Sequence, residues 1–107
     1  DAEDATEIAS LAPTVIIVEE PALIGAGTGG SRAAAAVTRT NAMISEINPA
    51  IRVLHAAGIG NPQDVYDVIA AGAEGTGSTS AIFGADDPGA MLESMIKAVR
   101  SAWDSSR

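Results

Sequence analysis

Two adjacent carboxylates, Glu19 and Glu20, stand where a buried strand is expected to end. The four residues before them, Val15–Val18, are apolar and β-branched, which predicts a strand buried on both faces, as in a parallel sheet. Parallel α/β proteins bind their ligands at the carboxyl ends of such strands. A carboxylate at this position has the chemistry of a catalytic base, which removes a proton from a carbon next to a carbonyl.

A glycine-rich turn follows the two acids and contains Gly25, Gly27, Gly29 and Gly30. Such a turn can be a plain flexible connection, and glycines alone are a weak signal. It can also be a lid whose hinges and backbone N–H groups close over a substrate phosphate and exclude water. Both interpretations stay open on the glycines alone.

The elements that must position these residues alternate along the chain. Asn61 and Pro62, like Asp87 and Pro88, combine an N-cap residue with a proline at the first helical position. Strand and helix alternate three times, which predicts an α/β fold with a parallel sheet. The expected strands cover residues 15–18, 52–55 and 75–83, and the expected helices cover residues 1–11, 31–47, 62–71 and 88–103.

The stretch from Glu19 to Gly27 reads E-E-P-A-L-I-G-A-G. It resembles the sixth-strand and lid-loop motif of triosephosphate isomerase, whose archaeal form reads E-P-P-E-L-I-G-T-G. In that family the leading glutamate is the base and the glycines belong to the loop that closes over the substrate. Counting back from the first glycine, Gly25, the resemblance implies Glu19 as the base and Gly25 as a phosphate contact. Glu20 takes the place of a family proline.

Two later segments resemble the phosphate-binding loops of the same family. The segment starting at His55, H-A-A-G-I-G-N-P-Q-D-V, is similar to the archaeal C-G-A-G-I-S-T-G-E-D-V, and the family's phosphate-binding N–H falls on Gly58. The segment starting at Glu74, E-G-T-G-S-T-S-A, is similar to E-G-V-L-L-A-S-G. Two adjacent backbone N–H groups of the family's phosphate clamp fall there on Thr79 and Ser80.

His55 is the only histidine of the chain. It stands where the family has a tyrosine or a cysteine, and the family's catalytic histidine follows the fourth strand, outside this chain. We therefore expect His55 to be a polar residue at a strand end instead of a catalytic acid.

The resemblance implies that the chain is the carboxyl-terminal portion of a (β/α)8 barrel, because 107 residues are too few for the whole fold. The implied activity is the interconversion of glyceraldehyde 3-phosphate and dihydroxyacetone phosphate through an enediol, without cofactor or metal. The family's lysine and electrophilic histidine lie outside this chain, so we expect the chain alone to be inactive. Members of the family form dimers or tetramers.

Composition limits the partners. Fourteen acidic and six basic residues give a formal charge of −8, which argues against nucleic acid and anionic membranes as partners. The absence of cysteine excludes disulfides and thiolate metal sites, and a single histidine argues against zinc. With no apolar run long enough to span a bilayer and no visible signal segment, we expect a cytoplasmic protein.

Two other functions remain open at this stage. The altered segment after Glu74 and the acid at Glu20 leave room for another phosphate-binding barrel enzyme, such as an epimerase or a lyase. A truncated, non-catalytic half-barrel that serves as an interaction module is the second alternative, because open strand edges favour association.

Overall fold

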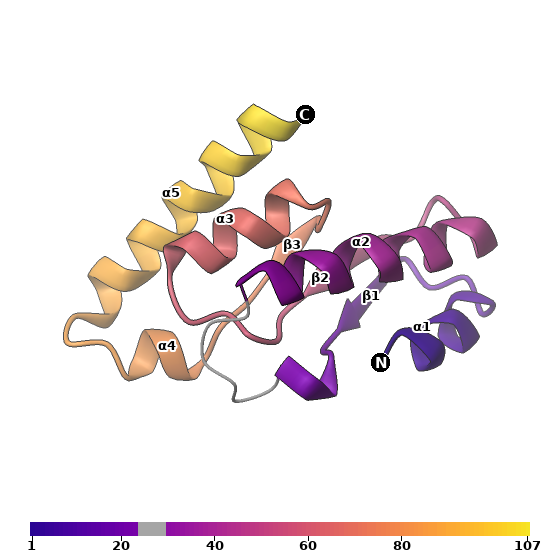
Figure 1. The fold of residues 1–107 in the computed structure, drawn as a ribbon, viewed down its shortest axis with the longest axis horizontal. Coiled ribbons are helices and arrows are strands. Elements are labelled where there is room, and N and C mark those ends of the chain that lie inside the picture. The colour runs from indigo at the N-terminus through magenta and orange to yellow at the C-terminus, as the bar shows by residue number, and fades with distance from the viewer. Residues whose placement is uncertain (24–29) are drawn as a thin grey trace.

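The computed structural model describes residues 1–23 and 30–107, and Figure 1 gives the arrangement of the helices and strands. Helices and strands alternate along most of the chain. In chain order the elements are α1 (Ala2–Ala9), β1 (Val15–Val18), η1 (Pro21–Leu23), α2 (Gly30–Ile47), β2 (Arg52–His55), α3 (Pro62–Ala70), β3 (Gly75–Thr76), α4 (Ser80–Phe83) and α5 (Pro88–Ser106).

The three strands form a parallel sheet in the order β1-β2-β3. Val15 pairs with Arg52 at the start of β1, and His55 of β2 pairs with both Val18 and Thr76. Within the described residues the sheet is open, with β1 and β3 as its edges. The prediction of a (β/α)8-barrel portion is therefore wrong for this chain, whose strands make a small three-stranded α/β sheet.

The third strand is much shorter than the 75–83 segment expected from the sequence. Only Gly75 and Thr76 pair with β2, and Ser80–Phe83 forms the short helix α4 instead. One cause is local and one is a contact between distant residues. Glycine and small polar residues pair poorly in a strand, and the Ser78 hydroxyl donates to the carbonyl of Ile59 at 2.9 Å, away from the ladder.

The prediction that β1 is buried on both faces is also wrong. Ile16 and Val18 are buried, whereas Val15 and Ile17 are 43% and 65% exposed. Alternate strand residues point to opposite faces, and the buried pair packs in one cluster with alanines of α1 and Ile44 of α2. The helices thus cover one face of β1 in the described residues and leave the other face accessible.

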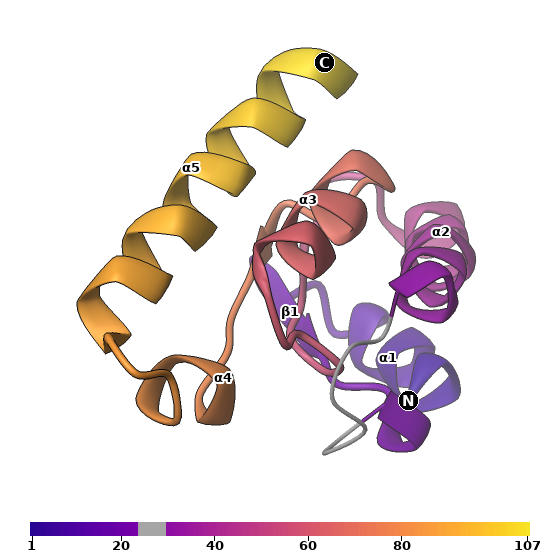
Figure 2. The same cartoon turned by 60° about the vertical axis from the view of Figure 1, so that its left-hand side comes forward.

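A layer of helices packs side by side, with α3 between α2 and α5, and α1 next to α2 (Figure 2). The predicted caps are confirmed. Asn61 accepts a hydrogen bond from the backbone N–H of Asp64, and Asp87 accepts one from that of Ala90. One face of α3 is buried: Val65, Val68, Ile69.

None of the helices in residues 1–23 and 30–107 is both long and apolar enough to cross a membrane.

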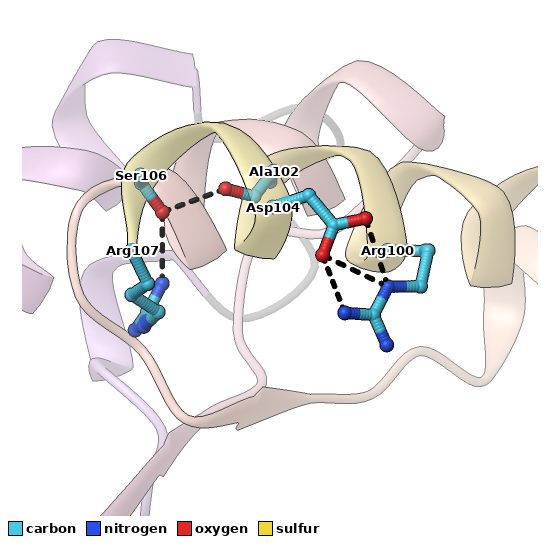
Figure 3. A network of polar contacts seen from close by, with 5 residues as sticks. All are labelled: Arg100, Ala102, Asp104, Ser106 and Arg107. Atoms are coloured by element: carbon cyan, nitrogen blue, oxygen red, sulfur yellow. Dashed lines mark hydrogen bonds and ion pairs between the residues drawn. The ribbon is translucent and has the colours of Figure 1, made fainter.

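Arg107 connects the end of α5 to the end of α3. Its guanidinium nitrogens donate to the carbonyls of Ile69 at 2.8 Å and Ala73 at 3.1 Å. The same group lies 4.0 Å from the centre of the Trp103 ring. Figure 3 shows Arg107 beside the Ser106 hydroxyl, and separately the exposed ion pair between Arg100 and Asp104.

Replacing Arg107 by alanine is expected to lower the free energy of unfolding by about 1 to 2 kcal/mol, because two carbonyls lose a charged donor and Trp103 loses its cation. The matched variant Arg100→Ala removes only a surface ion pair and should leave the unfolding midpoint nearly unchanged. Urea unfolding of both variants measures the difference. Equal losses of unfolding free energy in the two variants would contradict the proposed stabilising role of the Arg107 contacts.

Candidate functional site

A wide open cleft lies where the three parallel strands end. Its volume is about 500 Å³, and the residues around it come directly after β1, after β2 and after β3. It brings together four of the residues singled out in the sequence, namely Glu19, Gly58, Thr79 and Ser80. The remaining described lining residues are Ala56, Ala57, Ile59, Gly60, Ser78 and Ala81.

Glu19 is the first residue after β1, and its side chain is exposed. It is the only charged residue among the described residues that line the cleft. Every other described lining residue is apolar, glycine or a hydroxyl residue. Glu19 is therefore the described side chain in the cleft best suited to act as a base, by exchanging a proton with a bound molecule.

Glu20 has different surroundings from Glu19, although the two residues are adjacent. It lines a small cavity of about 10 Å³ together with Thr40 and His55, and it is absent from the described lining of the cleft. Its Oε2 lies 3.9 Å from an Arg39 guanidinium nitrogen. Glu19 thus lines the cleft, whereas Glu20 lines a different, smaller cavity.

Residues of two loops border the same cleft. Gly58, after β2, has φ +78°, a conformation that glycine adopts without the steric cost of a Cβ atom. Thr79 and Ser80 follow β3, and Thr79 is the N-cap of α4 without a side-chain cap bond. Gly25, the remaining predicted phosphate contact, lies outside the described residues.

The loop after β2 is held by hydrogen bonds that the motif comparison did not reveal. The backbone N–H of Gly60 donates to the Asp64 carboxylate at 2.9 Å, and the backbone N–H of Asp64 donates to Asn61 at 2.9 Å. Asp64 is 4% exposed. The three-residue spacing from the N-cap Asn61 is the sequence signal that could have identified Asp64 as a loop anchor.

His55, the last residue of β2, is not among the described lining residues of the cleft. It is 6% exposed, and its Nε2 lies 2.8 Å from Oδ1 of Asn41. Because the Asn41 amide nitrogen donates to the carbonyl of Gly72 at 3.0 Å, its oxygen faces the ring and Nε2 carries the proton. Burial lowers the pKa of His55 from 6.5 to about 4, so the ring is neutral at neutral pH.

The buried ring makes folding stability depend on pH. The unfolded chain takes up a proton on His55 near pH 6.5 and the folded chain only near pH 4, so stability is lost as the pH falls through this window. We expect His55 alone to account for a loss on the order of 2 kcal/mol. Urea unfolding at several pH values should show a shallower acid decline for His55→Gln. Identical pH dependence in both proteins would contradict this assignment.

Within residues 1–23 and 30–107, no group of three or more histidine and carboxylate side chains lies close enough together to hold a metal ion.

The fold and the cleft define a class: a parallel α/β protein whose candidate site is built by the loops after its strands. The model of the family described as "Thiazole biosynthesis protein ThiG" matches residues 2–106. The chain belongs to this family.

The resemblance to archaeal triosephosphate isomerases is confirmed by curated relatives with that name. The chain is 37% identical over 92 residues to the protein of Methanosarcina mazei, and this alignment covers 85% of the chain. It is 36% identical over 95 residues to that of Methanothermus fervidus and 34% identical over 91 residues to that of Sulfolobus acidocaldarius, covering 88% and 84% of the chain. The chain spans 41%, 43% and 39% of the length of these three relatives.

A solved structure shares the fold. A chain in the crystal structure of the Amycolatopsis orientalis BexX/CysO complex superposes with a TM-score of 0.75 at 20% sequence identity. The superposition covers 99% of this chain and 41% of the other. Together with the family match, this small parallel-sheet fold replaces the barrel portion that the sequence predicted.

Proposed function

We propose that this chain contributes the base and a phosphate clamp to an isomerase that interconverts glyceraldehyde 3-phosphate and dihydroxyacetone phosphate. The observation that carries the proposal is the common cleft, in which the carboxylate of Glu19 and the loops of Gly58, Thr79 and Ser80 border one space. The identity with curated isomerases over most of the chain supports it.

In this proposal Glu19 removes a proton from the carbon next to the substrate carbonyl, which gives an enediolate. The electrophilic histidine expected outside this chain donates a proton to the former carbonyl oxygen, which gives the enediol, and takes one back from the other oxygen when the product forms. The same carboxyl group returns the proton to the adjacent carbon, so no cofactor is consumed. The substrate phosphate accepts hydrogen bonds from the backbone N–H groups of Gly58, Thr79 and Ser80, with Gly25 as a further donor. Local donors are required because the formal charge of −8 repels a phosphate at long range.

The described cleft supplies no cation. Lys97, the only lysine of the chain, lies on α5 with its ammonium 3.1 Å from Glu93. We therefore propose that a lysine and an electrophilic histidine come from other parts of the full-length protein, so that residues 1–107 alone are inactive. The protein in this proposal is a cytoplasmic dimer or tetramer that acts on a small triose phosphate and binds neither nucleic acid nor membrane.

The family match favours a second candidate function, a role in thiazole biosynthesis. An enzyme of this kind would use the same loop-built cleft for a different substrate. The isomerase remains the first proposal because the sequence of Glu19 and its following loop matches the lid motif of the isomerases.

Activity assays on the full-length protein discriminate the candidates. The isomerase proposal predicts turnover of glyceraldehyde 3-phosphate that phosphoglycolate inhibits, and little turnover of longer sugar phosphates. Preference for a longer sugar phosphate would indicate an epimerase or another isomerase. Restored growth of a thiazole-requiring strain, without triose-phosphate turnover, would favour thiazole biosynthesis and contradict the first proposal.

A further inference from the structure

One side-chain hydrogen bond joins the two loops that border the cleft. The hydroxyl of Ser78 donates to the backbone carbonyl of Ile59 at 2.9 Å. Ser78 directly precedes Thr79, and Ile59 directly follows Gly58. The bond therefore joins the two loops at the residues next to the proposed phosphate donors.

The backbone pairing of the sheet does not hold these loops together. The paired residues of β2 and β3 end with His55 and Thr76, before either loop reaches the cleft. Beyond this point, Ser78 provides a described link between the loop after β2 and the loop after β3. In the isomerase sequences that the chain resembles, this position is an apolar strand residue, so a hydroxyl here changes how the loops are connected.

The acceptor side of this bond is firmly anchored. Ile59 is 7% exposed, and its side chain belongs to the buried cluster formed with α3 and α5. The next residue, Gly60, donates its N–H to the carboxylate of Asp64. The buried side chain of Ile59 and the hydrogen bond of Gly60 hold the carbonyl of Ile59 in place. The hydrogen bond from the Ser78 hydroxyl to this carbonyl therefore also restrains the loop that contains Thr79.

We propose that Ser78 is a positioning residue that sets the separation between the N–H group of Gly58 and those of Thr79 and Ser80, and so determines the affinity of the cleft for a phosphate group. This inference rests on the proposed function of the cleft. An anion bound by several fixed donors gains affinity when the donors are held in place before binding.

The test measures the dissociation constant of inorganic phosphate by titration calorimetry with the full-length protein. Ser78→Ala is expected to weaken binding roughly tenfold while the unfolding midpoint stays close to that of the parent protein. Ser78→Thr keeps the hydroxyl and should restore the parent affinity. Ser78→Cys keeps the volume with a weaker donor and should fall between them; it replaces the alanine variant if that variant does not fold.

Ser10→Ala is the matched control, because Ser10 donates to the carbonyl of Glu7 on α1, away from the cleft. It should bind phosphate as the parent does. Parent-like binding by Ser78→Ala would overturn the positioning role while leaving the phosphate cleft intact. Equal weakening in Ser10→Ala would overturn it too, because the effect would then be general. Absence of phosphate binding in the parent protein would refute the proposed cleft and this inference together.

Discussion

Replacing Glu19 by glutamine is expected to lower the kcat for triose-phosphate isomerisation by about 10²- to 10⁴-fold, the range typical of a lost general base. Glutamine preserves the size of the side chain and removes its ability to accept a proton. The Michaelis constant should change little, because the substrate phosphate is held by backbone groups. Steady-state kinetics of the full-length variant measure both quantities.

The adjacent acid provides the matched control. Glu20→Gln removes a carboxylate at the next position, but Glu20 lines the small cavity with His55 instead of the cleft. Its kcat should stay within about threefold of the parent value, which is small beside the contribution of a catalytic base. A large loss of kcat in Glu20→Gln, together with a parent-like kcat in Glu19→Gln, would contradict the assignment of Glu19 as the base and indicate Glu20 instead.

Replacing Gly58 by alanine is expected to have the second largest effect. With φ +78°, an alanine at this position should cost roughly 1 to 2 kcal/mol of folding free energy. If the loop relaxes to relieve the strain, the N–H group of residue 58 turns away and phosphate binding weakens. Urea unfolding and phosphate titration of the same variant measure the two effects.

Gly77→Ala is the corresponding control on the other loop. A Cβ atom there meets only the Cβ of Ala56, at 4.0 Å, which is ordinary contact. Its stability should be unchanged or raised by up to about 1 kcal/mol, since alanine restricts the unfolded chain. If Gly58→Ala were as stable as Gly77→Ala and bound phosphate equally well, the conformation of Gly58 would have no functional role.

Local sequence signals predicted much of the secondary structure. The pairs Asn61-Pro62 and Asp87-Pro88 marked the starts of α3 and α5, because N-capping and proline geometry depend on neighbouring residues. The strands β1 and β2 have the predicted bounds. The resemblance to the isomerases implied the grouping of Glu19 with the loops after β2 and β3, and the rule that parallel strands end at one edge of a sheet agrees with it.

Features that depend on distant contacts were not predictable in this way. The exposure of Ile17 depends on which face the helices cover, and four apolar residues do not encode that choice. The link from Ser78 to Ile59 joins residues 19 positions apart and ends the ladder early. The expected barrel required strand pairings that no local sequence pattern specifies. It was predicted from the resemblance to the longer triosephosphate isomerases, and this prediction was wrong.

The most direct test of the account is a crystal structure of the full-length protein with bound phosphoglycolate. The account predicts that the phosphate oxygens lie about 2.7 to 3.2 Å from the backbone nitrogens of Gly58, Thr79 and Ser80. It also predicts that the Glu19 carboxylate reaches the end of the ligand that mimics the reacting carbons, at about 2.6 to 3.2 Å. A ligand bound elsewhere, or a Glu19 side chain directed away from it, would contradict the central claim.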